Sequence, residues 1–314
     1  MQNNEKIIGI FGGNSFLAKY TIEKLCKEGY RMKIGTRKPW LVNQIRTAAA
    51  PGQIILMPTN VFDPKSVEEV LRDCTFCINF CGQLIEGKTS HYQLHSQWPE
   101  MLSKISNEYK IKKLIHISAL NPVENHPALY MKSKMLGEEK IKQNIENYFI
   151  LRPSLIYGNG DDRFFSSFGT MAQISPIIPL PFSGSTKFSP VHASDCAEAI
   201  VKLLKIENSK NRTFEIAGTS NYSLKSLINI FLSEIKKKRL LIPAPFIKMQ
   251  SYFLQYFPQP FTITPDQILL LQQHSIPTGK FPLLKDLGIT PKEIQSVFPY
   301  WKRWRTGGEF NKDN

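Results

Sequence analysis

The sequence predicts an α/β fold in which helices cover both faces of a parallel, doubly wound sheet. Six short apolar runs follow one another along the first half of the chain, at residues 7–11, 32–34, 54–57, 76–80, 114–117 and 148–151. Apolar residues at helical spacing occur between most of these runs, at residues 20–28, 66–71, 99–109 and 133–145. This alternation is typical of βαβ units, and runs this apolar favour parallel strands that are buried on both faces.

Length and composition agree with a folded protein that has one large domain, or one domain and a smaller lobe. The chain has 314 residues, of which 42% are hydrophobic, so it can bury a full core. Its formal charge of +14 and its pI near 9.5 favour anionic partners, such as a phosphorylated cofactor, a nucleic acid or an anionic membrane. Charge alone does not choose among these partners.

Cysteine content and hydropathy indicate the compartment. Five cysteines without the spacing of a disulfide framework indicate reduced thiols in a cytosol-like compartment. The first residues are polar and lead directly into the first apolar run, and no stretch offers the roughly 18 consecutive apolar residues of a membrane span. We therefore expect a soluble or peripheral protein with no transmembrane span.

The chain is expected to divide into two interleaved parts. Residues 1–160 form the expected dinucleotide-binding domain, and residues 161–305 form a smaller C-terminal lobe in which prolines are frequent and the alternation weakens. Residues 190–205 have the pattern of a strand that enters a helix, so they are expected to return to the first domain. The polar tail, residues 306–314, is expected to be frayed.

A turn rich in small residues follows the first apolar run. The expected strand ends at Phe11 and a helix follows, so backbone N–H groups and a helix N-terminus would meet a pyrophosphate there. The turn and the start of the helix consist of Gly12, Gly13, Asn14, Ser15, Phe16 and Leu17. This layout predicts a Rossmann-type dinucleotide site; the alternative is an ordinary strand-to-helix turn, in which the Ser15 hydroxyl caps the helix.

The loop after the second apolar run predicts which dinucleotide binds. A protein that prefers NAD usually carries an acidic residue there for the ribose hydroxyls, whereas this chain has Gly35-Thr36-Arg37-Lys38. Two cations without an acid would attract a 2′-phosphate, so the sequence predicts NADP(H) in preference to NAD(H). The alternative is a solvated basic loop on a basic protein.

Four more polar or small residues follow the third and fourth runs. Asn60 and Asp63 lie where such folds commonly place a polar residue against the adenine ring, and Asn79 and Gly82 would run along the cofactor. For each of them taken alone, turn chemistry explains the residue type equally well.

A possible catalytic set follows the fifth run. Ser118 comes directly after it, and Tyr130 and Lys134 are spaced to share one face of a helix. A nearby ammonium would lower the pKa of the Tyr130 phenol, which could then act as a general acid or base while Ser118 holds a substrate oxygen. The same tyrosine and lysine could instead bind the nicotinamide ribose without turnover.

Together these motifs resemble the extended short-chain dehydrogenase/reductase superfamily, and within it the Rossmann-fold NAD(P)H-binding accessory subunit of respiratory complex I and its alphaproteobacterial relatives. The closer resemblance rests on residues 113–120, 134–138, 151–154, 156–158, 161–164, 167–168 and 171, and on 190–191, 195 and 286–289. Departures from the family pattern are Ser15 and Ala18 in the glycine turn, and Asn60 where an acid is usual.

The resemblance implies a tightly held NADPH with a mainly structural role, at the junction of the hydrophilic and membrane arms of complex I. Pro153 joins Tyr130 and Lys134 among the expected cofactor-binding residues. The expected partners are complex I subunits and a membrane surface, contacted through the C-terminal lobe, and the expected location is cytoplasmic or peripheral on the cytoplasmic (matrix-equivalent) face of the inner membrane. Whether the chain is an enzyme stays open.

Two other hypotheses remain beside this one. The first is an active NADPH-dependent oxidoreductase or epimerase that acts on a carbonyl, quinone, sterol or sugar-nucleotide substrate. The second is an RNA-binding relative of the superfamily. Trp301-Lys302-Arg303-Trp304-Arg305 places aromatics between cations, as a nucleic-acid site would. Without a recognised RNA-binding module, we expect an exposed contact segment there and no specific nucleic acid.

Three further groups of residues have a structural explanation beside a functional one. Cys74, Cys77 and Cys81 approximate the spacing of metal ligands, but they lie on a strand-like run, so no metal site is expected. His91 and His95 have helical spacing without an acidic partner and are expected in a loop or at the surface.

A basic cluster precedes an aromatic segment in the C-terminal lobe. Lys236-Lys237-Lys238-Arg239 comes before a helical pattern that gathers Phe246, Met249, Phe253, Tyr256 and Phe257 on one face. This pattern suits either an anionic membrane or a partner groove, or a helix packed on the core of its own lobe.

Overall fold

A parallel sheet of seven strands organises the first part of the structure, a computed structural model that describes residues 6–160, 163–207, 212–257 and 261–305. The strand order is β11-β6-β5-β4-β1-β2-β3. The strands are β1 (Ile7–Phe11), β2 (Arg31–Thr36), β3 (Ile54–Pro58), β4 (Phe76–Asn79), β5 (Lys113–Ile117), β6 (Tyr148–Pro153) and β11 (Thr213–Ile216). The predicted doubly wound α/β fold is confirmed.

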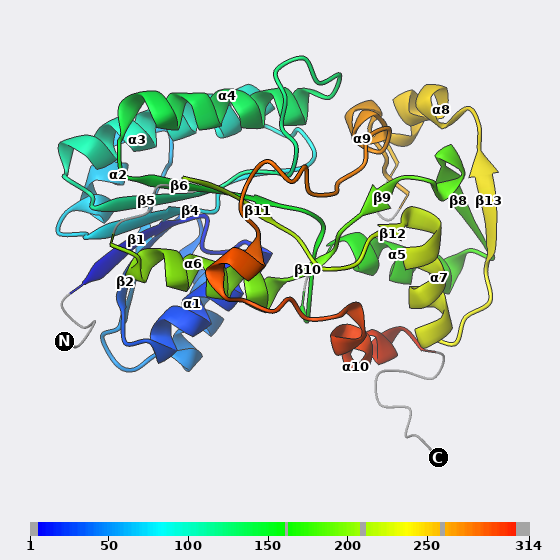
Figure 1. Cartoon of the computed structure of the whole chain (residues 1–314), viewed down its shortest axis with the longest axis horizontal. Helices are drawn as coiled ribbons and strands as arrows, with labels where there is room; N and C mark the ends of the chain where they lie inside the picture. Colours follow the sequence, from blue (N-terminus) through cyan, green and yellow to red (C-terminus); the bar gives the residue numbers. More distant parts are fainter. Residues whose placement is uncertain (1–5, 161–162, 208–211, 258–260, 306–314) are drawn as a thin grey trace. The chain divides into compact units, whose positions relative to one another are not determined.

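Helices cover both faces of this sheet (Figure 1). The helices are α1 (Phe16–Lys27), α2 (Pro64–Leu71), α3 (Trp98–Glu108), α4 (Leu129–Asn144) and α6 (Ala193–Lys205). Helices α1 and α6 pack together on one face, where Lys24 Nζ lies 2.8 Å from Glu198 Oε2. Helices α2, α3 and α4 cover the other face around a core that includes Phe11 and Trp98, whose rings meet edge to face with centroids 5.0 Å apart.

Short helical turns complete this part of the chain. The turns are η2 (Pro39–Ala48), the π-helical η3 (Gln93–Gln97) and η5 (Leu284–Leu287). The segment that carries η5 is tied to β11 through Glu215, which is fully buried. Thr278 donates its backbone N–H and its hydroxyl to the Glu215 carboxylate, at 2.8 and 2.6 Å. The Phe281 ring lies under the Arg152 guanidinium at 4.7 Å.

The chain divides into two units by its internal contacts. Unit 1 comprises Met1–Pro153, Ala193–Ile216 and Thr278–Thr290, and unit 2 comprises Ser154–His192, Ala217–Pro277 and Pro291–Asn314. Helix α6 therefore belongs with the sheet of unit 1, although it follows a segment of unit 2 in the sequence. The predicted frayed tail, residues 306–314, lies outside the described residues.

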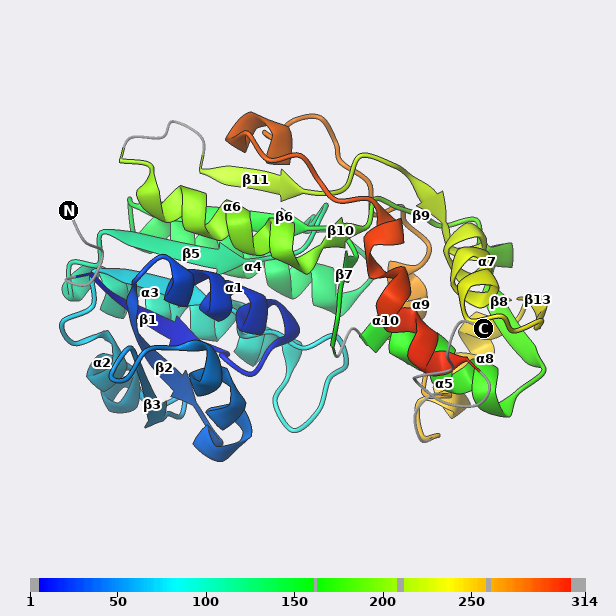
Figure 2. The same cartoon turned by 90° about the horizontal axis from the view of Figure 1, so that it is seen from below.

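Unit 2 consists of strand pairs and short helices around a second core (Figure 2). Its strands pair as β7 (Ile156–Tyr157) with β10 (Val191–His192), β9 (Lys187–Phe188) with β12 (Tyr222–Ser223), and β8 (Ile177–Pro181) with β13 (Leu240–Ala244). Its helices and turns are α5 (Arg163–Ile174), η4 (Phe182–Gly184), α7 (Leu224–Glu234), α8 (Ile247–Leu254), α9 (Pro265–Leu270), η6 (Ile294–Val297), α10 (Phe298–Trp301) and η7 (Lys302–Trp304).

Trp301 lies inside this second core, so the expectation of an exposed segment at residues 301–305 was wrong for this residue. Its side chain is only 3% exposed, and its ring meets those of Phe165 and Phe231 at centroid distances of 4.6 and 5.0 Å. Burying three large rings together provides much of the apolar area that holds a small unit. No helix within the described ranges is long and apolar enough to cross a bilayer.

Candidate functional site

The glycine turn lies where the order of the strands reverses. Strand β1 pairs with β2 on one side and with β4 on the other, so the loops after β1 and β4 leave the sheet side by side. Phe80 N donates a hydrogen bond to Phe11 O at 2.9 Å, directly beyond the last paired residues. In open α/β sheets, this reversal at the carboxyl ends of the strands is where ligands bind.

Both glycines of the turn are required by the packing of the protein itself. Gly12 has a φ of +79°, and a Cβ atom there would lie 2.8 Å from the backbone nitrogen of Cys81. A Cβ atom on Gly13 would lie 2.4 Å from Cγ2 of Ile34. The two glycines therefore let the loops after β1 and β4, and the strand β2, approach each other closely.

Ser15 caps helix α1, as the alternative explanation of this residue anticipated. Its backbone is extended and its hydroxyl oxygen accepts a hydrogen bond from Ala18 N at 3.2 Å. The N–H groups of Phe16 and Leu17 precede the first possible i to i−4 bond of the helix. The first turn carries no acidic residue. The helix end therefore offers backbone donors and positive potential to an anion.

The basic loop follows directly from β2. Arg37 and Lys38 are both exposed, and no acidic residue lies between Gly35 and Lys38. Thr59 N donates to Thr36 O at 3.0 Å, which places the end of β3 beside this loop. Two exposed cations therefore flank the carboxyl edge of the sheet near the glycine turn.

Asn60 and Asp63 take part in turn and cap interactions. Asn60 Oδ1 accepts from Phe62 N at 3.1 Å, and Asp63 Oδ1 accepts from Lys65 N at 3.2 Å at the start of α2. These bonds account for both residue types. A contact of either residue with adenine stays a prediction.

Asn79 is a buried organiser of the loop after β4. Its Oδ1 accepts from Trp98 Nε1 and from Cys81 N, both at 3.0 Å, and its Nδ2 donates to His116 Nδ1 at 3.0 Å. Burial lowers the pKa of His116 well below its usual value, so the ring is neutral and can accept at Nδ1. Asn79 thus fixes the backbone that leads to Gly82.

Gly82 and Lys134 lie against each other. A Cβ atom on Gly82 would lie 3.2 Å from Lys134 Nζ, which donates to Ile117 O at 3.0 Å. Burial lowers the pKa of Lys134 to about 8, against the opposing effect of the Glu138 carboxylate. The structure therefore brings together two residues that the sequence placed in the cofactor site.

The pKa of the Tyr130 phenol is raised in the structure, whereas the sequence predicted a lowered one. Its ring centroid lies 6.0 Å from Lys134 Nζ, and burial raises the pKa of the phenol to about 12. The expectation of a lowered phenol pKa was wrong, because desolvation outweighs the attraction of an ammonium at this distance.

Ser118 donates its hydroxyl to a buried ion pair that the sequence had not suggested. Its Oγ lies 2.6 Å from Glu138 Oε1, and the Arg152 guanidinium donates to both oxygens of the same carboxylate, with Nη2 to Oε2 at 2.6 Å and Nε to Oε1 at 2.9 Å. All three side chains are buried. Glu138 follows Lys134 at helical spacing on α4, and this spacing was the sequence signal that could have indicated its role.

Pro153 ends the adjacent β6, where its carbonyl accepts from Leu120 N at 3.0 Å.

His91 and His95 are buried, so their predicted loop or surface position was wrong. The π-helical turn η3 directs His95 inward, where Nε2 accepts from Gln83 N at 3.1 Å and Nδ1 lies 3.0 Å from Ser133 Oγ. Burial and Lys134 lower the pKa of His95, so the ring is neutral. Both histidine rings meet Tyr130 edge to face, at centroid distances of 5.7 and 5.3 Å. The loop after β4 is thereby tied to α4.

Cys74, Cys77 and Cys81 lie on or beside β4. Cys77 belongs to that strand, and Cys74 and Cys81 flank it. Burial raises the pKa values of Cys74 and Cys81 to about 12, so both thiols are protonated. No cluster of metal-ligating side chains occurs among the residues that the structure describes.

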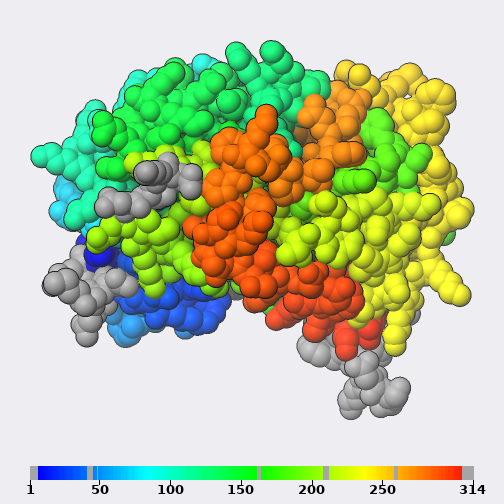
Figure 3. Space-filling view, in the orientation of Figure 1, coloured from blue at the N-terminus to red at the C-terminus, as the bar shows by residue number. Residues whose placement is uncertain are grey.

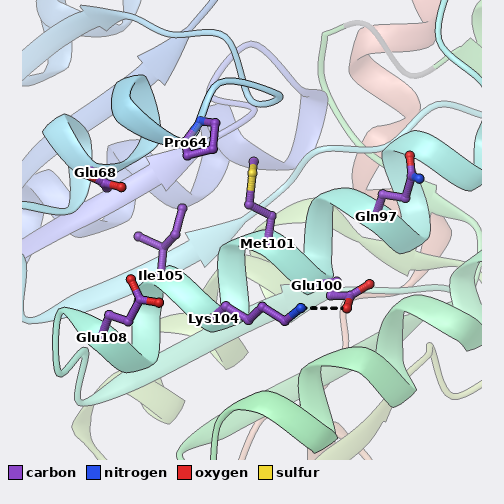
Figure 4. Close-up of a pocket in the computed structure, with 8 residues that line it drawn as sticks. All are labelled: Pro64, Glu68, Gln97, Glu100, Met101, Lys104, Ile105 and Glu108. Carbon is purple, nitrogen blue, oxygen red and sulfur yellow. Dashed lines mark hydrogen bonds and ion pairs between the residues drawn. The ribbon is translucent and has the colours of Figure 1, made fainter.

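A surface hollow of about 560 Å³ lies between α2 and α3 (Figure 4). Its lining includes the carboxylates of Glu68, Glu100 and Glu108, and Lys104 Nζ lies 2.9 Å from Glu100 Oε1. An acidic lining repels phosphate groups. This hollow is therefore unsuited to a dinucleotide, unlike the turn at Gly12.

Comparisons with known proteins agree with the fold. The chain is 25% identical over 315 residues to the mitochondrial NADH dehydrogenase (ubiquinone) 1 alpha subcomplex subunit 9 of Dictyostelium discoideum, with 98% of this chain and 87% of that protein covered. The subunit of the same name from Mus musculus is 25% identical over 300 residues, with 92% and 78% covered. The solved structure of triphenylmethane reductase from Citrobacter sp. matches with a TM-score of 0.74 and 15% identity, over 94% of this chain and 99% of that chain.

A model of the NAD dependent epimerase/dehydratase family matches residues 8–217, from β1 to the end of β11. The match includes the glycine turn, the basic loop and the Ser118, Tyr130 and Lys134 set. Since it covers well over half of the 314 residues, the chain belongs to the NAD dependent epimerase/dehydratase family.

Proposed function

We propose that this protein holds NADP(H) in unit 1 chiefly as a structural cofactor and serves as an accessory subunit of the complex I type. The observation that carries the proposal is a dinucleotide turn combined with an engaged catalytic set. Ser118 donates to Glu138, and the Tyr130 phenol has a pKa of about 12. A group that must give or take a proton near neutral pH works best with a pKa near that pH.

The residues present fit a dinucleotide. The start of α1 supplies backbone donors for a pyrophosphate, and Lys134 has further N–H groups besides the one that meets Ile117 O. Bound NADPH would supply a hydride only in the alternative, catalytic role. The role proposed for the chain's own residues is to bind and orient it: Gly82 and Pro153 would lie along its path, and the buried Asn79 would hold the loop that carries Gly82.

Arg37 and Lys38 support a preference for NADP(H). Both cations are exposed at the carboxyl end of β2, where a 2′-phosphate would lie, and no acid is present to accept the ribose hydroxyls. Charge-assisted hydrogen bonds from Arg and Lys to phosphate are stronger than those between neutral groups.

The partners proposed for the chain follow from its relatives. Two of them are named as subunits of NADH dehydrogenase (ubiquinone), and the alignments cover most of both chains. We extend this to partnership with complex I subunits and with a membrane surface through unit 2, on the cytoplasmic (matrix-equivalent) face. Copurification of tagged protein with membrane-arm subunits is expected; a protein that associates neither with them nor with membranes contradicts this part.

Calorimetric titration tests the cofactor preference. Replacing Arg37 and Lys38 by Ser should weaken NADPH binding about 10- to 100-fold, which corresponds to the loss of one or two charged hydrogen bonds, and should leave NADH binding nearly unchanged. Lys110→Ser with Lys112→Ser, two exposed lysines at the amino end of the sheet, is the matched control for the loss of two charges. Equal weakening of both cofactors, or the same weakening in the control, contradicts a 2′-phosphate site.

An active reductase or epimerase is the second candidate, favoured by one observation. Lys134, with its pKa lowered to about 8, shares one face of α4 with Tyr130, whose ring centroid lies 6.0 Å from Lys134 Nζ. Purified protein would then oxidise NADPH with a quinone, ketosteroid or sugar nucleotide, and Tyr130→Phe would abolish this activity. Activity that survives Tyr130→Phe, or no activity at all, favours the structural cofactor.

A further inference from the structure

The two-stranded sheet β8/β13 turns an apolar face outward. One side of β8 packs into the core of unit 2. On the other side, the register places Leu240 beside Ile177 and Ile242 beside Pro179, and all four side chains are exposed. A strand with one buried face usually carries polar residues on its outer face. This face carries none at these four positions.

The helix α8 follows β13 directly and exposes its aromatic side. Ile247 and Ser251 are its buried residues, whereas Phe253 is 71% exposed and Tyr256, just beyond the helix, is 84% exposed. The other exposed apolar side chains of this segment are Phe246, Met249, Tyr252 and Phe257. The aromatic face recognised in the sequence is therefore not packed on the core of its own unit.

Figure 3 shows the side chains of this segment, in yellow, at the surface of unit 2. We call the outer face of β8/β13 and the exposed side chains from Phe246 to Phe257 the apolar rim. Contiguous exposed apolar patches of this kind are rare on monomeric soluble proteins, and they mark interaction sites.

Cations outnumber acids beside the apolar rim, where the acidic residue of the neighbouring α9 is Asp266. Residues 240–265 contain a single charged residue, Lys248, and Lys236-Lys237-Lys238-Arg239 precedes them. Lys236, Lys238 and Lys248 are exposed. The nearby Glu234 is engaged by Arg305, with Nη2 2.9 Å from Oε1. The surface that best complements the charge of the apolar rim is therefore an anionic one.

A bilayer interface fits these features better than a protein groove. Phenylalanine and tyrosine side chains are favoured at headgroup depth, and lysines beside them attract anionic lipids. The exposed aromatics project from the outside of a helix, and no described helix could span a bilayer. A segment of this kind lies in the interface plane.

We infer that the apolar rim is an interfacial anchor that inserts its aromatic side chains among the headgroups of a bilayer containing anionic lipids. This inference rests on the proposed function, since it specifies the membrane surface that unit 2 contacts. It assigns membrane contact to the apolar rim and to the exposed Lys236, Lys238 and Lys248, and it requires no ligand in unit 1.

Sedimentation with vesicles tests the inference on the full chain. The vesicles contain either phosphatidylcholine alone or phosphatidylcholine with phosphatidylglycerol, at low and high salt. Wild-type protein should sediment with the anionic vesicles, less so at high salt, and weakly with phosphatidylcholine. The double variant Phe253→Ser with Tyr256→Ser should lower the partition coefficient at least about 10-fold, and Lys236→Gln with Lys238→Gln should lower it about 10-fold on anionic vesicles only.

Tyr300→Ser is the matched control, because Tyr300 is an exposed aromatic of unit 2 outside the apolar rim. It should leave the partition coefficient unchanged. NADPH binding is measured on the same samples. It shows whether each variant is folded, and it tests separately the proposal that unit 1 binds NADP(H). The inference is overturned if wild-type protein does not sediment with anionic vesicles, or if the aromatic variant sediments like wild type. A soluble dimer that the aromatic variant converts to monomer also overturns it, because a second copy then covers the apolar rim.

Discussion

Gly12 lies where the loops after β1 and β4 meet, and two separate effects act on it. Its φ of +79° disfavours any side chain, and a Cβ atom would also lie 2.8 Å from Cys81 N. Gly52 has nearly the same φ, +76°, with no atom within 4 Å of its Cβ position. Comparing substitutions at Gly12 and Gly52 therefore distinguishes the cost of backbone strain from the cost of close packing.

We expect Gly52→Ala to cost about 1 kcal/mol of unfolding free energy, since only φ is strained. Gly12→Ala should cost at least about 2 kcal/mol more, because the loops must move apart. Urea unfolding measures both variants. Equal costs would show that the closeness of the two loops does not limit this position.

Glu138 holds the buried contacts of Ser118 and Arg152. Glu138→Ala should cost about 3–5 kcal/mol, because it leaves the Arg152 guanidinium buried without its partner. Ser118→Ala should cost about 1 kcal/mol, the usual net value of one hydrogen bond. Glu100→Ala, in an exposed ion pair with Lys104, should cost under about 1 kcal/mol. A Glu138 variant as stable as the Glu100 variant contradicts the assignment.

Lys134 makes the stability of unit 1 depend on pH. Its pKa is about 8 in the folded chain and 10.5 in its ordinary state, so the folded protein binds its proton less readily than the unfolded chain. The contribution of Lys134 to the free energy of unfolding therefore rises as pH increases from about 8 to 10.5. The buried thiols act in the opposite direction, because burial raises their pKa values.

Comparison with Lys134→Met isolates this contribution. At pH 7 the variant should be more stable than the wild type, by at most about 3 kcal/mol, and the advantage should shrink between pH 8 and 10.5. Urea unfolding across this range measures the difference. A difference that does not change with pH contradicts the lowered pKa of Lys134.

At the scale of elements, the π-helical turn η3 fixes the position of α4. A Cβ atom on Gly137 of α4 would lie 1.9 Å from the carbonyl oxygen of His95 in η3. Alanine normally favours a helix over glycine by about 1 kcal/mol. Here Gly137→Ala should instead destabilise by about 2–3 kcal/mol, because the backbones must separate.

Lys132→Ala, an exposed position of the same helix, is the control and should change stability by less than about 0.5 kcal/mol. Thermal unfolding of both variants decides the matter. A Gly137→Ala protein that gains stability would show that η3 and α4 are not packed this closely.

The regular elements of unit 1 were predictable, because their periodic patterns are strong. Each predicted run from residue 7 to 151 overlaps a strand from β1 to β6. The seventh strand, β11, was missed, since Thr213-Phe214-Glu215-Ile216 is short and carries a buried glutamate whose partners come from residues 278–282. The sequence of β11 alone does not show those partners.

The candidate site was predictable in its location more than in its chemistry. The turn at Gly12 and the shared face of Tyr130 and Lys134 follow from local spacing. The raised pKa of Tyr130 depends on burial beneath His91 and His95, which come from a distant turn of unusual geometry. Residues that depend on such long-range contacts leave little trace in local sequence patterns.

At the scale of the whole molecule, the two units have different chemical characters. Unit 1 carries the family's sheet and the dinucleotide turn, and unit 2 carries the apolar rim and its cations. A cofactor bound to unit 1 would stabilise the folded chain by mass action, whereas an anchor on unit 2 would act on location. The two proposals can therefore fail independently.

The dinucleotide content of freshly purified protein tests the central claim most directly. Denaturing the protein and identifying the released nucleotide by mass spectrometry should yield NADP(H), close to one per chain, with little NAD(H). Protein that releases no dinucleotide and gains no thermal stability from added NADPH would contradict the account, as would protein that releases NAD(H) alone.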